Sequence, residues 1–224
     1  MFLSCKEVIL DMISFNPLGI DRKIRSELMI NPKDIIFFPE PDPNENPWVH
    51  GKPAEEVIGV VAYNPEWVVT WQQLSASIKK ALGNIVLHIE HVGSTAVPGL
   101  AAKPVIDIDL IVLDPIQEQT YVPALEQLGY DLTVREPSFY QHRCLRLAKP
   151  RVNLHVFGPD CPEHIRHILF RDWLREHPED CQRYMTAKIN AKDNVSQVMH
   201  YNQRKEQVVR EIYQRIFQSQ GLLS

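Results

Sequence analysis

Two aspartates stand one residue apart inside an apolar run, in the segment VIDIDLIV of residues 105–112. Side chains alternate across a strand, so Asp107 and Asp109 share one face while the aliphatic residues between them take the other. Two neighbouring carboxylates in a partly buried place repel each other and lose hydration unless a cation or strong donors compensate. Mg²⁺ is such a cation, because one or two carboxylates hold it together with substrate phosphates. The pair therefore predicts a Mg²⁺ site that recruits a nucleoside triphosphate.

A Gly-Ser dipeptide precedes the acidic pair and follows another apolar run. Gly93 allows a close backbone approach, and the N–H groups and hydroxyls of Ser94 and Thr95 are candidate partners of phosphate oxygens. A Gly-Ser followed by D-x-D, each after an apolar strand, is more specific than either motif alone. The alternative is an ordinary turn followed by two aspartates that accept hydrogen bonds at a strand end.

The elements that must position these motifs follow from hydrophobic periodicity. We expect strands at residues 85–92, 104–113, 130–136, 138–148 and 152–158, and helices at residues 65–82, 115–128 and 162–217. The last two strands form a hairpin that turns at KPR. Together these elements predict an α/β (α+β) fold, a mixed sheet with flanking helices and a helical C-terminal portion.

A proline-rich stretch separates the N-terminal part of the chain from the rest. Five prolines between Phe37 and Pro53 discourage both helix and central strand. We therefore expect an N-terminal extension and Pro-rich linker over residues 1–57 and a single domain over residues 58–220. Limited proteolysis within the linker should then leave a folded fragment that begins near residue 58.

Composition restricts the class of partner. The formal net charge of −4 argues against general nucleic-acid binding by phosphate neutralisation. No apolar run is long enough to span a bilayer, and the four cysteines form no C-x-x-C pair. We expect a cytoplasmic protein with small-molecule partners and no membrane partner.

At these motifs the sequence resembles the nucleotidyltransferase superfamily, and more closely the GrpB-like family. The resemblance spans about residues 58–217 and rests on YNPEW, IEHVGSTAVPGLAAKPVIDIDL, NLHVFG, FRDWLREHPE and the pair Tyr184 and Lys188. It implies a nucleotidyltransferase-like fold. Active members of the superfamily usually carry a third carboxylate on a later strand, where this chain has Asn153 and His155. A neutral imidazole can accept a proton near pH 7, so His155 is a candidate base toward the acceptor; the alternative is a structural histidine.

Basic residues must balance phosphate charge. The candidates are Lys103, Arg143, Arg146 and, through the resemblance, Arg171. Strand alternation places Arg143 and Arg146 on opposite faces, and each cation is individually more often a surface charge or a salt-bridge partner. A rival metal motif is Cys161, His164 and His167, but steps of three residues diverge around a helix and a fourth zinc ligand is missing.

Two classes of function remain. The first is a Mg²⁺-dependent nucleotidyltransferase that moves a nucleotidyl group from a nucleoside triphosphate to a small acceptor. Asp107 and Asp109 would bind the metal, Gly93 and Ser94 would bind phosphate, and His155 would act as the base. The second is a noncatalytic module that binds a nucleotide or phosphate ligand on the same fold. Metal-dependent consumption of nucleotide separates these two. A third possibility is an enzyme that uses the same scaffold for different phosphate or ligation chemistry, which product analysis would separate.

Overall fold

A five-stranded mixed sheet organises the protein, in a computed structural model that describes residues 30–40, 42–52, 59–191 and 198–223. The strand order is β1-β2-β5-β4-β3; β2 and β5 are parallel, and every other neighbouring pair is antiparallel. The strands are β1 (His88–Val92), β2 (Ile106–Ile111), β3 (Asp131–Glu136), β4 (His142–Leu147) and β5 (Val152–Phe157). The helices are α3 (Pro32–Ile36), α4 (Glu66–Leu82), α5 (Val122–Gln127), α6 (Pro162–Glu176), α7 (Pro178–Ala191) and α8 (Val198–Ser219), with short 3-10 turns at Gly83–Ile85, Ser94–Ala96 and Glu118–Thr120.

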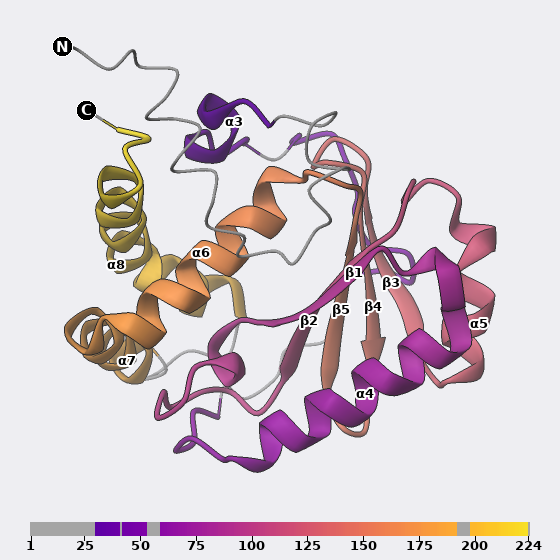
Figure 1. The fold of residues 1–224 in the computed structure, drawn as a ribbon, viewed down its shortest axis with the longest axis horizontal. Coiled ribbons are helices and arrows are strands. Elements are labelled where there is room, and N and C mark those ends of the chain that lie inside the picture. Colours follow the sequence, from indigo (N-terminus) through magenta and orange to yellow (C-terminus); the bar gives the residue numbers. More distant parts are fainter. Residues whose placement is uncertain (1–29, 41, 53–58, 192–197, 224) are drawn as a thin grey trace, which may run out of the picture.

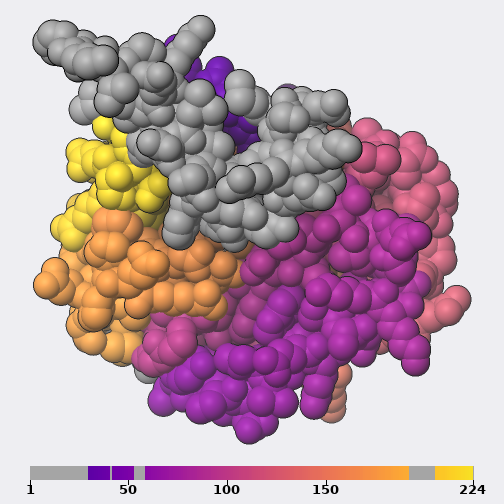
Figure 2. All heavy atoms as spheres, viewed as in Figure 1, coloured from indigo at the N-terminus to yellow at the C-terminus, as the bar shows by residue number. Residues whose placement is uncertain are grey.

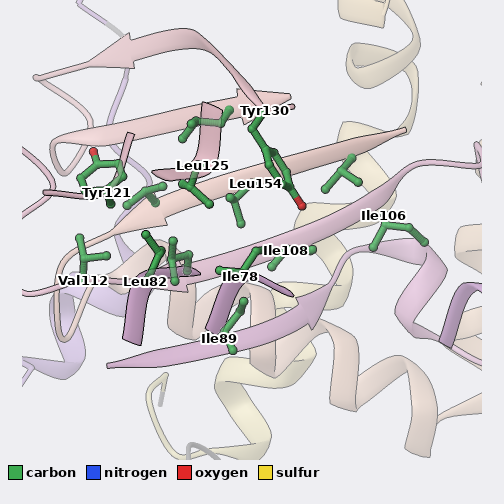
Figure 3. Close-up of a cluster of buried hydrophobic side chains, with 14 of the residues drawn as sticks. Ile78, Leu82, Ile89, Ile106, Ile108, Val112, Tyr121, Leu125, Tyr130 and Leu154 are labelled. Atoms are coloured by element: carbon green, nitrogen blue, oxygen red, sulfur yellow. The ribbon is translucent and has the colours of Figure 1, made fainter. Parts of the chain in front are cut away.

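Helices α4 and α5 cover the apolar face of the sheet (Figure 1). Ile108 of β2 and Leu154 of β5 are fully buried there against Ile78 of α4 and Leu125 of α5 (Figure 3). Burying one aliphatic side chain of this size contributes about 1.5–3 kcal/mol. The alternating pattern of β2 therefore fixes which face of the sheet is polar, because its aliphatic residues are held on the α4 side.

The C-terminal helices lie on the other face. Figure 1 shows α6, α7 and α8 gathered on the side of the sheet away from α5, and in Figure 2 they adjoin the first half of the domain. Their own core includes Leu174, Tyr184, Ile212 and Phe217, together with Leu100 from the segment before β2. The polar side chains of the sheet are thus enclosed between strands and helices.

The predicted fold class is confirmed, with two corrections. The single helix expected over residues 115–128 is wrong: a turn at Asp114, a 3-10 turn and the six-residue α5 replace it. Tyr121 interrupts this segment with φ −131°, and its hydroxyl donates to the carbonyl of Pro115 at 2.7 Å. The expected C-terminal helix is divided, with α6 ending at Glu176 and α7 beginning at Pro178. None of the described helices combines the length and apolar composition needed to cross a membrane.

The described part of the N-terminal extension packs on the domain. Arg166 of α6 is fully buried, and its guanidinium donates to the carbonyls of Asp34, Ile35 and Phe37 at 2.9–3.1 Å. The guanidinium also forms an ion pair with Glu163, with 2.6 Å between Nη2 of Arg166 and Oε2 of Glu163. Residues 1–29 and 53–58 lie outside the described residues, so the boundary expected at residue 58 and the folded fragment beginning there stay predictions.

The Pro-rich segment pairs with the outer edge of β3. The carbonyl of Pro47 accepts from the N–H of Arg135 at 2.9 Å, and the N–H of Val49 donates to the carbonyl of Thr133 at 3.1 Å. Trp48 thereby forms an antiparallel bridge with Val134. The expected linker is thus held to the sheet over residues 47–49.

Candidate functional site

The acidic pair lies at the centre of the polar face. In register, Asp109 is opposite Glu90 of β1 and His155 of β5, while Asp107 is opposite Asn153 of β5. Asp109 is 0% exposed and Asp107 is half-buried. The prediction that both carboxylates share one face is confirmed.

Two imidazoles of α6 compensate the charge of Asp109. Nδ1 of His164 lies 2.8 Å from Oδ2 of Asp109, and Nδ1 of His167 lies 2.9 Å from the same oxygen. Burial alone would raise the pKa of Asp109, but the charge and hydrogen bonds of the two histidines hold it well below its usual range. Burial would lower the pKa of His167, whereas Asp109 raises it well above the ordinary value. Asp109 and His167 therefore form an ion pair in which the carboxylate is buried and the imidazole partly exposed.

Asp107 is held by a different group. Its Oδ1 accepts a hydrogen bond from Nδ2 of Asn153 at 2.8 Å. Burial raises the pKa of Asp107, and Asn153, His167 and Lys205 counteract this rise. The two carboxylates thus differ in their readiness to ionise, as expected for neighbouring acids with unequal partners.

Gly93 brings the Gly-Ser turn against Asp107. Its backbone has φ +68° and ψ −168°, a conformation that only glycine adopts readily. A Cβ at Gly93 would lie 2.5 Å from Oδ2 of Asp107, which is closer than any unbonded contact allows. The turn and the acidic pair, fourteen residues apart in sequence, are therefore parts of one site.

A tyrosine and two lysines close this site from α7 and α8. Tyr184 hydrogen-bonds with Ser94 and Lys205. Lys188 is only 2% exposed; its Nζ donates to the carbonyl of Ala101 at 2.7 Å and lies 5.3 Å from the Tyr184 ring centroid. Burial and Lys205 lower the pKa of Lys188 to about 8, although Tyr184 opposes them. These groups bring positive charge to the neighbourhood of the Gly-Ser turn from sequence positions about 90 to 110 residues later.

A small cavity of about 60 Å³ lies at the turn. Its lining combines polar and aromatic side chains with the backbone of the turn: Gly93, Ser94, His167, Phe170, Arg171, Leu174, Tyr184 and Tyr213. Its volume suits one or two waters or a single small anionic group rather than a whole nucleotide.

Three other predicted phosphate ligands lie at different places around the turn. Thr95 is buried, and its hydroxyl bonds to Nε2 of His91 and the carbonyl of Val105, so it braces the turn. Arg171 borders the cavity, but its guanidinium is bonded to Glu90 at 2.6 Å and to the carbonyl of His91 at 2.9 Å. Lys103 lies in the segment between the turn and β2.

The two arginines of β4 lie on opposite faces, as predicted. Arg143 is opposite Val156 on the apolar side and pairs with Glu118 at 2.6 Å, so the structure does not bring it to the site. Arg146 is opposite Asn153 on the polar side, and its guanidinium lies 6.0 Å from the ring of Trp48. Of this pair, only Arg146 shares the face of the aspartates.

His155 is where strand alternation predicts, on the polar face beside Asp109. Its Nδ1 lies 3.0 Å from Nε2 of His142, and burial lowers its pKa to about 3. The imidazole is consequently neutral at physiological pH, the form that accepts a proton.

Sequence reasoning treated His164 and His167 as a rival zinc motif. The structure turns both toward Asp109 on adjacent turns of α6, and in the described ranges no group of three His, Cys, Asp or Glu residues has the arrangement of a metal centre. The available signal was two histidines three residues apart on the helix that follows β5, the strand beside the acid-bearing β2.

Comparisons with known proteins agree with this architecture. A family model described as GrpB protein matches residues 57–215. The UPF0157 protein BH1888 of Halalkalibacterium halodurans is 43% identical over 165 residues, which cover 73% of this chain and 85% of that protein. The crystal structure of the conserved protein GrpB from Enterococcus faecalis is 28% identical with a TM-score of 0.60, and the match covers 71% of this chain and 99% of that one. A more distant match is terminal uridylyl transferase 4 from Trypanosoma brucei with bound UTP, at 15% identity and a TM-score of 0.43, covering 69% of this chain and 52% of that one.

Proposed function

Because this chain belongs to the GrpB protein family, we propose that it binds a nucleoside triphosphate at the Gly-Ser turn and moves the nucleotidyl group to a small acceptor. One observation carries the proposal: Gly93 lies so close to Asp107 that a single methyl group between them would clash. A ligand whose phosphates meet the N–H groups of the turn would therefore also meet the acidic pair.

The proposed metal is Mg²⁺, which would be held by Asp107 and Asp109. Their carboxylate oxygens are the donor type that Mg²⁺ takes, and when bound the ion would offset the charge of the phosphates. Asp109 already accepts hydrogen bonds from His164 and His167. Binding of the ion would thus compete with these imidazoles for the same oxygens.

Positive groups of the helices would meet the phosphate. Lys188 and Lys205 both lie near Tyr184, and Tyr184 bonds to Ser94 at the turn. A lysine that is buried with few counter-charges binds an anion more strongly than an exposed one, because solvent screens it less. We therefore propose that these groups, rather than Arg143, bind the phosphate.

His155 would accept the proton of the acceptor hydroxyl. It is neutral, half-buried and in register with Asp109. General-base catalysis of this kind contributes about 10²- to 10⁴-fold to a rate.

A second candidate function is noncatalytic binding of a nucleotide or phosphate ligand. It is favoured by the ion pair of Asp109 with His167, since the protein then balances its own acidic pair without a metal. The residues in place of the superfamily's third carboxylate, Asn153 and His155, favour it as well. In this case the ligand would bind and leave unchanged.

The double substitution of Asp107→Asn and Asp109→Asn tests both candidates. Nucleotides are titrated into wild type and variant by calorimetry, with and without Mg²⁺, and mass spectrometry follows the nucleotide. The proposal expects metal-dependent binding and nucleotide consumption that the double variant loses, while Glu126→Gln, on the α5 side of the sheet, keeps both. Binding without consumption selects the noncatalytic module, and equal binding by the folded double variant refutes the site.

A further inference from the structure

A carboxylate and two imidazoles form a line across the polar face of β3, β4 and β5. Oε2 of Glu136 lies 2.6 Å from Nδ1 of His142, and Nε2 of His142 lies 3.0 Å from Nδ1 of His155. His155 in turn is in register with Asp109. The line runs from the partly solvent-exposed Glu136, at 33% exposure, through the buried His142, at 8%, to the site.

Aromatic packing fixes the middle ring. The centroid of the His142 ring lies 4.8 Å from that of Phe157, with 24° between the ring planes, and Phe139 meets it edge-on at 6.2 Å. The His142 and His155 rings are inclined by only 23°. A buried imidazole held in this way cannot exchange its two nitrogens by flipping without breaking its packing.

Hydrogen-bond roles then determine where the protons are. An ionised carboxylate only accepts, so Nδ1 of His142 carries the proton that faces Glu136. In its neutral form, His142 therefore presents a lone pair at Nε2, and Nδ1 of His155 donates to it. The second nitrogen of His155, Nε2, is consequently left with its lone pair on the side of the ring away from His142.

We propose that Glu136 and His142 are positioning residues that lock His155 in the tautomer with a free Nε2 and carry protons between that nitrogen and the surface. The proposal rests on the proposed function, in which Nε2 of His155 accepts the acceptor proton. When Nε2 gains a proton, Nδ1 of His155 passes its own to Nε2 of His142, and Nδ1 of His142 passes its own to Glu136. Each imidazole ends neutral in the opposite tautomer, and one proton has moved from the site to the surface carboxylate.

The surroundings favour this direction of transfer. Burial lowers the pKa of His155, so its imidazole does not retain the added proton. Cys144 lies opposite His155 on β4, but burial raises the pKa of its thiol to about 12 and keeps it protonated. His167 is 6.0 Å from His155 between ring centroids and is already charged through Asp109. Glu136 is thus the proton acceptor to which the hydrogen-bonded line leads.

Nitrogen-15 NMR of the imidazoles tests the lock without any substrate. In the wild type near neutral pH, His155 should show a protonated Nδ1 and an unprotonated Nε2. Glu136→Gln presents an amide that both donates and accepts, so His155 should lose its single tautomer. Asp131→Asn is the matched control, because Asp131 makes a similar carboxylate–imidazole contact with His50 at 3.0 Å on the same strand but at the exposed surface. It should leave the His155 signals unchanged.

The wild-type spectrum alone can overturn the proposal, if Nε2 of His155 carries the proton. An unchanged single tautomer in both Glu136→Gln and His142→Phe, which keeps an aromatic ring against Phe157, would overturn it as well. If nucleotidyl transfer is detected, Glu136→Gln should also lower kcat about 10- to 100-fold with little change in KM, the usual cost of losing a residue that orients a catalytic group. A protein without transfer activity that shows the predicted tautomer would refute the proposed function and leave the lock intact.

Discussion

Replacing Gly93 by alanine should damage both stability and the site. A side chain in the backbone conformation of Gly93 costs about 1–3 kcal/mol. The added methyl would also meet Oδ2 of Asp107 at 2.5 Å and its Cβ at 3.0 Å. Displacing a packed side chain costs about another 1–3 kcal/mol. We therefore expect the free energy of unfolding to fall by about 2–6 kcal/mol, the sum of these two terms.

Urea unfolding with a matched control separates the two terms. Gly99 also has a positive φ, +79°, but a Cβ there would meet no atom within 4 Å, so Gly99→Ala isolates the backbone term. The difference between the two variants measures the contact with Asp107. Combining Gly93→Ala with Asp107→Ala should recover much of that difference, because it removes the carboxylate that the methyl displaces. Equal losses for Gly93→Ala and Gly99→Ala would refute the reasoning that the turn lies against the acidic pair.

Four further predictions concern charged and titrating groups. Arg166→Met should leave three carbonyls of the N-terminal segment without their donor and so accelerate proteolysis near residues 34–37; an unchanged digestion rate contradicts this packing. His167→Gln should lower the free energy of unfolding by about 3–5 kcal/mol near pH 6. Because Asp109 raises the pKa of His167, this stabilisation is full below the unfolded value of about 6.5 and declines as pH rises through the folded pKa. The loss measured in urea titrations should therefore become smaller at alkaline pH, and a constant loss would contradict the ion pair. Phosphate binding should weaken as pH rises through about 8, where Lys188 loses its proton, and calorimetry of Lys188→Met should lack that dependence. If transfer occurs, His155→Ala should lower its rate about 10²- to 10⁴-fold evenly above about pH 5, since the imidazole is already neutral there, and a variant with a changed pH profile would assign the base elsewhere.

The features that depend on strand alternation could be predicted from the sequence. Asp107, Asp109 and His155 share one face because side chains in neighbouring strands follow the same period of two. The opposite placement of Arg143 and Arg146 follows from the same rule. Local periodicity is sufficient for statements about residues within one strand, whereas the position of His155 beside Asp109 also depends on the parallel pairing of β5 with β2.

The partners of these residues could not be predicted, because they come from distant segments. His167 reaches Asp109 from α6, and Lys188 reaches the carbonyl of Ala101, in the segment between the Gly-Ser turn and β2, from α7. Their approach depends on how the C-terminal helices cross the sheet, which no local pattern specifies. The sequence favours Arg143 as a phosphate ligand because it belongs to a locally basic stretch, whereas its partner in the structure, Glu118, comes from the distant segment where a single helix was expected.

Strand β3 is one of the two outer strands of the sheet, and an uncovered outer strand is a template for the addition of another chain. Residues 47–49 cover part of it, and on their own outer side the N–H of Trp48 already donates to Oδ1 of Asn46 at 3.2 Å. A chain shortened to begin at residue 58 would expose the backbone of Thr133 and Arg135 to neighbouring molecules. We expect such a fragment to self-associate through β3 at high concentration, so the proline-rich segment keeps the protein from aggregating through that edge.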